Sequence, residues 1–86
     1  MAATLQVSVI SPERTVFEGT AEQVIAPAWD GAIGILRGHA PMLILLGEGD
    51  VHVRGAGQDQ RFRIAGGFLQ VIDDRVTILS EHAQGG

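Results

Sequence analysis

The chain of 86 residues contains no cysteine, no lysine and no long apolar run. The absence of cysteine excludes disulfides, thiolate metal ligands and cysteine nucleophiles. The absence of lysine excludes a lipoyl or biotinyl carrier domain, an all-β domain of about this size that attaches its cofactor to a lysine at a hairpin tip. The longest continuous apolar run, Met42 to Leu46, is far shorter than the ~20 residues of a membrane helix. We therefore expect no direct membrane insertion; any work at a membrane would depend on a protein partner.

The composition, with 45% hydrophobic and 19% charged residues, is that of a single globular domain spanning residues 1–86. We expect its ordered part to cover about residues 3–82, and residues 84–86 to be a frayed end or a truncation point. The net charge is −4, and all six basic residues are arginines dispersed along the chain. Arg61 and Arg63 share a strand face, but two arginines do not form a nucleic-acid footprint, so no nucleic-acid partner is expected.

Short strand patterns separated by turn signals run through the whole chain, and no window has helical spacing with a cap and a stop. The pattern predicts eight to ten short strands in an all-β sandwich or flattened barrel. Strands are predicted by period-two alternation or by apolar runs at residues 5–9, 15–18, 21–26, 32–36, 42–46, 51–54, 61–64, 68–72 and 75–79. Turns or breaks are predicted at residues 11–14, 28–31, 37–41, 47–50, 55–59, 66–67 and 73–74.

Two of the predicted strands, Met42–Leu46 and Phe68–Ile72, are apolar on both sides, with Gln70 as the one polar member. An ordinary antiparallel strand is apolar on one side only. The excess predicts an exposed apolar patch, which usually marks a partner surface. The alternative is that these residues fill the two ends of an irregular core.

The chain lacks a convincing chemical constellation. His39, in a glycine-flanked loop, and Asp30 could serve a small hydrolase, but no serine lies in a strained elbow between strand and helix. The separations of 13 and 30 residues between His39, His52 and His82 give no close pair of metal ligands. The glycine-rich segments open no helix that could bind phosphate. We expect no catalytic residue, no metal and no cofactor.

Trp29 keeps one further function class open. In a turn, an exposed tryptophan could stack on a ligand, as in a free-standing β-sandwich module that binds a glycan or a peptide. The alternative for Trp29 is packing against the end of the barrel.

Several segments, taken in order, resemble the N-terminal domain of the epsilon subunit of F-type ATP synthase, and the resemblance covers almost the whole chain. The opening strand and turn at residues 5–14 resemble the start of that domain. The other matching segments are Asp30-Gly31, Gly34-Ile35-Leu36, Gly38-His39-Ala40-Pro41, Gly66-Gly67-Phe68 and Val76-Thr77-Ile78-Leu79.

The resemblance implies a flattened ten-stranded β-barrel or β-sandwich. The 86 residues depart from the family in lacking a segment like its usual C-terminal helical hairpin, so hairpin-based inhibition by this chain alone is not expected. It implies a non-catalytic rotor subunit of the central stalk that links the gamma subunit to the c-ring and couples rotation to ATP synthesis. The expected location is the cytoplasmic side of the bacterial inner membrane, peripheral through the complex. We expect the isolated chain to be a monomer.

The resemblance also implies two contact surfaces. The residues expected to contact the c-ring are Asp30, Gly31, Ala32, Arg37, Gly38, His39, Ala40, Pro41 and Met42. The residues expected to contact the gamma subunit, chosen from the two apolar strands, are Leu43, Leu45, Leu46, Phe68 and Gln70.

Overall fold

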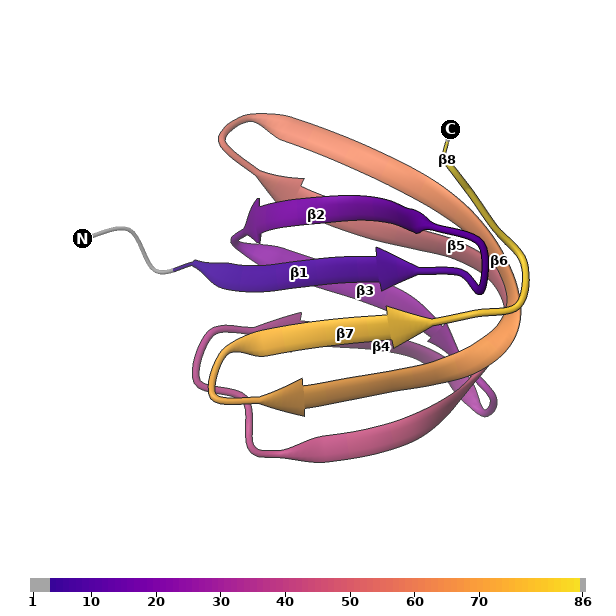
Figure 1. Cartoon of the computed structure of the whole chain (residues 1–86). Coiled ribbons are helices and arrows are strands. Elements are labelled where there is room, and N and C mark those ends of the chain that lie inside the picture. Colours follow the sequence, from indigo (N-terminus) through magenta and orange to yellow (C-terminus); the bar gives the residue numbers. More distant parts are fainter. Residues whose placement is uncertain (1–3, 86) are drawn as a thin grey trace.

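The computed structural model describes residues 4–85, which form eight strands and no helix (Figure 1). The all-β prediction is therefore confirmed, and no helix in this range could span a membrane. The strands are β1 (Leu5–Ile10), β2 (Thr15–Ala21), β3 (Gln23–Ala28), β4 (Gly31–Leu36), β5 (Met42–Gly55), β6 (Gln58–Ile72), β7 (Arg75–Leu79) and β8 (Ala83–Gly85).

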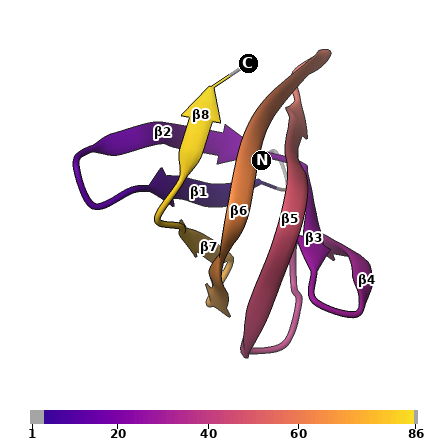
Figure 2. The same cartoon turned by 90° about the vertical axis from the view of Figure 1, so that its right-hand side faces the viewer.

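The strands follow the order β2-β1-β7-β6-β5-β3-β4, with β8 paired separately to β6. Among the strand pairs of residues 4–85, β1 with β7 is the one parallel pair. β7 pairs with residues 68–72 of β6, whereas β8 pairs with residues 62–64 of the same strand. Figures 1 and 2 show β5 and β6 running side by side and curving, so that their two halves belong to two layers of a sandwich.

The core lies between these layers and is built from alternate side chains of every long strand, as period-two patterning requires. The rings of Phe17 and Phe62 are tilted against each other with centroids 5.2 Å apart. The largest fully buried side chains are Leu5, Val7, Val9, Val24, Ile35, Val51, Ile64, Leu69, Val71, Val76 and Ile78.

The nine strand ranges predicted from the sequence become seven, because two expected interruptions are bends inside long strands, and the unpredicted β8 brings the number in residues 4–85 to eight. β5 continues through Gly47–Asp50 and β6 through Gly66–Gly67. Pairing persists across the bend, with Leu46 opposite Gly67 and Glu48 opposite Ala65. Gly66 and Gly67 have φ values of 76° and 123°, which L-residues rarely adopt. Glycine therefore lets two paired strands bend together instead of ending them.

The chain near its C-terminus also differs from the expectation. Residues 83–85 were expected beyond the ordered part, but they form β8 against the first half of β6. Ala83 packs against the core. Residues 1–3 and residue 86 lie outside the described residues.

Candidate functional site

A row of apolar side chains, three of them exposed and the fourth, Ile10, half-buried, crosses four neighbouring strands on the outer face of one layer. Leu45 of β5 is paired with Phe68 of β6, and Phe68 is paired with Leu79 of β7. Leu79 is in turn paired with Ile10 of β1. Residues paired across strands project from the same face. Leu45, Phe68 and Leu79 are 53%, 48% and 48% exposed. We call Leu45, Phe68, Leu79 and Ile10 the apolar row.

The apolar character is concentrated where the strands bend. In the next row along the same face, Leu43 is followed by the polar Gln70 and Thr77. On the side of the apolar row away from Gln70 and Thr77 lies a hollow of about 450 Å³, beside Phe68, Leu79 and Ile10. It is bordered by the β1–β2 turn and by the segment that leads from β7 to β8. The face therefore presents an apolar edge with a recess, a shape suited to receiving another protein's side chains.

The sequence prediction of an exposed apolar patch is confirmed, and core filling does not account for these residues. Of the side chains expected to contact the gamma subunit, Leu43, Leu45, Phe68 and Gln70 are exposed. The prediction that Leu46 contacts a partner is wrong, because its side chain is only 5% exposed and belongs to the core. Successive side chains of a strand point to opposite faces, so the neighbour of exposed Leu45 points inward.

Sequence reasoning missed two members of the apolar row, Ile10 and Leu79. Each stands at the end of a strand whose other residues alternate normally, so neither strand is unusual when read alone. Their importance comes from register, since Leu79 lies between Phe68 and Ile10 in the sheet.

The two segments expected to contact the c-ring lie at opposite ends of β4. Asp30, Gly31 and Ala32 are at its start, whereas Arg37 to Met42 follow its end. Six residues of extended strand span roughly 20 Å, so the segments do not form one compact patch. β4 is the last strand in the sheet order, and most of it is exposed. Both segments are thus parts of one exposed sheet edge. Exposed residues of these segments are Asp30, Gly31, Ala32, Arg37, Gly38, Ala40 and Pro41, while His39 and Met42 are half-buried.

The arrangement does not support a hydrolase built on Asp30 and His39. The His39 ring lies with Nδ1 2.8 Å from the carbonyl oxygen of the adjacent Ala40. Asp30 makes no side-chain hydrogen bond or ion pair with any residue between 4 and 85. The two side chains belong to opposite ends of β4, so the catalytic hypothesis is wrong.

The loop that carries His39 is fastened to the turn between β6 and β7. The backbone N–H of Gly38 donates to Oδ1 of Asp74 over 2.7 Å, and Nε of Arg37 lies 3.7 Å from Oδ2 of the same carboxylate. Asp74 has φ 61°, in the left-handed region. One aspartate thus joins two turns that are far apart in sequence, a contact with no signal in the sequence patterning.

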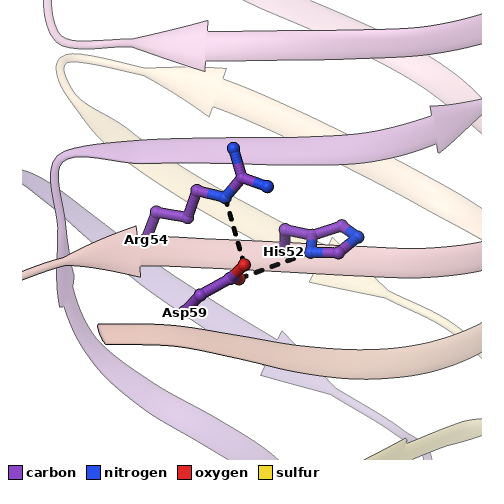
Figure 3. Close-up of polar contacts among 3 residues, drawn as sticks. All are labelled: His52, Arg54 and Asp59. Carbon is purple, nitrogen blue, oxygen red and sulfur yellow. Dashed lines mark hydrogen bonds and ion pairs between the residues drawn. The ribbon is translucent and has the colours of Figure 1, made fainter. Parts of the chain in front are cut away.

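The outer face of the second layer is polar. Figure 3 shows Asp59 between two side chains of β5: its Oδ1 is 3.3 Å from His52 Nδ1, and its Oδ2 is 3.3 Å from Arg54 Nε. Arg63 lies 3.7 Å from Asp50. Exposed pairs of this kind add little to stability, and opposite charges balance one another across the face. Within residues 4–85 no group of three metal-binding side chains occurs.

Trp29 lies in the β3–β4 turn and is 71% exposed, so the interpretation that it packs against the end of the barrel is wrong. The turn itself is fixed, because the Trp29 N–H donates to the carbonyl oxygen of Leu45 over 3.1 Å. An exposed ring on a fixed turn could contact a ligand or a partner.

Comparison with known proteins gives a consistent result. Residues 4–86 match the family described as "ATP synthase, Delta/Epsilon chain, beta-sandwich domain". An ATP synthase epsilon chain of a Synechococcus strain is 43% identical over 83 residues, covering 96% of this chain and 61% of that protein. The ATP synthase epsilon chain of Chromohalobacter salexigens is 44% identical over 82 residues, covering 94% of this chain and 58% of that protein. The chain spans about three fifths of the length of these relatives.

Solved structures agree on the fold. A chain in the Euglena gracilis mitochondrial ATP synthase, in a structure of OSCP, F1 and c-ring, superposes with a TM-score of 0.90 at 22% identity, covering 99% of this chain and 55% of that chain. A chain in the central stalk and c-ring of the Tetrahymena thermophila mitochondrial ATP synthase gives a TM-score of 0.75 at 16% identity, covering 92% of this chain and 64% of that chain.

Proposed function

Because this chain belongs to the family of ATP synthase delta/epsilon beta-sandwich domains, we propose that it is a non-catalytic part of the central stalk. In this role it joins the gamma subunit to the c-ring, so that rotation of the ring is passed to the shaft and coupled to ATP synthesis. Its place is peripheral, on the cytoplasmic side of a bacterial inner membrane, held there through the complex.

The observation that carries the proposal is the apolar row, which a monomer leaves in contact with water. Three large side chains of the row are about half exposed and sit on adjacent strands. Burial of apolar area contributes about 25 cal/mol for each Å² removed from water, so covering this face would stabilise a complex. We assign the apolar row, with Leu43 and Gln70 of the next row, to the gamma subunit.

The exposed edge along β4 is the proposed contact with the c-ring. The two ends of this edge are Asp30–Ala32 and Arg37–Met42. A partner can contact both ends at once only if it lies along β4. Asp30 at one end, and Arg37 and His39 at the other, supply the polar side chains through which these ends would contact polar loops. His39 would act here as a contact residue.

The sandwich is also rigid enough to transmit torque between two partners. β4 is paired to β3, β3 to β5, and β5 to β6, so the proposed ring edge is connected to the apolar row by continuous strand pairing. Close-packed interiors have low compressibility and transmit strain. Torque applied at one edge would reach the other contact with little deformation.

Binding of the gamma subunit to a Phe68→Asp variant tests the proposal. A charge in the middle of a buried apolar contact should weaken binding by more than about 2 kcal/mol, or about thirtyfold in Kd. Ala65→Asp is the matched control, because Ala65 is an exposed residue of the same strand outside the apolar row, and this variant should bind normally. Titration calorimetry with purified gamma subunit measures both.

Equal binding by the two variants would overturn the assignment of the apolar row. Capture of a glycan or a peptide in place of gamma, lost on Trp29→Ala, would favour the alternative binding module.

A further inference from the structure

The first residues of β5 form a sheet edge that is open on one side. Residues 42–46 pair with β6, from Met42 opposite Val71 to Leu46 opposite Gly67. On the other side, β3 pairs with β5 only from Leu46 onward. The stretch Met42–Leu45 therefore has a strand neighbour on one side alone, within the described chain.

The hydrogen bond from Trp29 to Leu45 identifies the backbone groups that point outward from this edge. It shows that the carbonyl of Leu45 faces away from β6. In an antiparallel strand the N–H and C=O of one residue point to the same side, and the side alternates along the chain. Leu43 therefore also faces outward. By this alternation the N–H and C=O of Leu43 and the N–H of Leu45 point away from β6, and no strand of residues 4–85 pairs with Leu43 or Leu45 on that side.

This edge lacks the usual protection against pairing. Natural edge strands carry charges, prolines or bulges that prevent another chain from adding to the sheet. The sequence here is Met-Leu-Ile-Leu, and the side chains of Leu43 and Leu45 are 66% and 53% exposed. The exposed Trp29 lies beside this edge, because its N–H is bonded to the carbonyl of Leu45. Outward backbone groups and exposed apolar side chains therefore coincide.

We propose that an extended segment of the gamma subunit adds to β5 as a further strand along Leu43–Leu45. The inference rests on the proposed function and deepens it. The gamma subunit is the expected partner because the open edge adjoins the face assigned to it. Leu43 and Leu45 project from that face, so a partner that covers the face also reaches the open edge of β5. The added segment is uncharged and apolar at alternate positions, because its neighbours on this edge are Leu43, Leu45 and Trp29.

Amide hydrogen exchange, read residue by residue by NMR, tests the added strand. In the free chain, the Leu43 and Leu45 amides should exchange fast and the Ile44 amide, which faces β6, should exchange slowly. In the complex with purified gamma subunit, the exchange of the Leu43 and Leu45 amides should slow by about a hundredfold or more, as in a paired strand.

A pair of Leu43 variants separates the backbone from the side chain. N-methylation of the Leu43 amide, introduced by chemical synthesis of the chain, removes the outward N–H and keeps the side chain. It should weaken binding to gamma by about tenfold, the effect of one lost hydrogen bond with an unpaired partner group. Leu43→Ala keeps the N–H, and its complex should retain slow exchange at residue 43. Slow exchange at Ile44 in both free variants verifies that β5 is intact.

Three results would overturn the inference. A complex that is weakened by Phe68→Asp but in which the Leu43 amide still exchanges fast would leave the proposed function standing and remove the added strand. Concentration-dependent dimers of the free chain with a slow Leu43 amide would assign the edge to a second copy. The lack of any complex with gamma would remove the proposed function itself.

Discussion

Gly67 lies where the bend of β6 passes closest to the end of β7. A Cβ built there would overlap the carbonyl oxygen of Leu79 and lie 3.0 Å from Cα of Ser80. Gly67→Ala should therefore lower the free energy of unfolding by more than about 3 kcal/mol, since only backbone movement can relieve the overlap. Gly31→Ala is the matched control, because Gly31 has a similar φ of 132° but nothing within 4 Å. It should cost about 1–2 kcal/mol. Urea denaturation compares them, and equal losses would contradict the close approach.

Ser80 fastens the same bend with its hydroxyl group, which is buried. Its Oγ lies 2.7 Å from the carbonyl oxygen of Gly66 and 2.9 Å from that of His82, so its one proton is shared between them. Ser80→Ala should lower the free energy of unfolding by about 1–3 kcal/mol, because these carbonyls lose a buried donor. Ser8→Ala, on the outer face of β1, should stay within about 0.5 kcal/mol of the parent. Thermal melts check both, and a neutral Ser80→Ala would show that water replaces the hydroxyl.

At the scale of elements, the sequence indicates which residues form strands but does not indicate whether two neighbouring strand segments are continuous. Alternation predicted the short strands well, because burial of one face dictates it. The glycines at positions 47, 49, 66 and 67 were interpreted as ends of strands. A glycine that ends a strand and a glycine that bends two paired strands have the same local signal, and only the partner strand distinguishes them. Interpreting these glycines as strand ends affected the site prediction, because the apolar row lies beside the bend that they form in β5 and β6.

The candidate site shows the same limit. The apolar strands near Leu45 and Phe68 were found from composition, but Leu46 was placed on the wrong face. The register that brings Ile10 and Leu79 beside Phe68 depends on pairing between strands distant in sequence. The free edge at Leu43 depends on where β3 stops pairing with β5, which no local pattern records.

At the scale of the whole molecule, the two proposed contacts are separable, since they lie on different faces linked by strand pairing. The attachment of the 37–41 loop to Asp74 gives a way to disturb one without the other. Asp74 is half-buried, and its carboxylate holds Gly38 and Arg37. The loop belongs to the proposed ring edge and lies outside the apolar row.

Asp74→Gly removes both contacts to the loop without backbone strain, because glycine accepts the positive φ at this position. Asp73→Gly is the matched control: Asp73 also has a positive φ, of 49°, but makes no side-chain contact to the loop. Both variants should lose about 1 kcal/mol or less of stability, since the ion pair is exposed.

Binding to the gamma subunit should be unchanged in both variants. Assembly with a c-ring in reconstituted rotor complexes, measured by co-sedimentation, should fall only for Asp74→Gly, because a loosened loop must be ordered again on binding. Equal assembly by the two variants would place the ring contact elsewhere than the 37–41 loop, whereas parallel loss of gamma binding would show that the two faces are not independent.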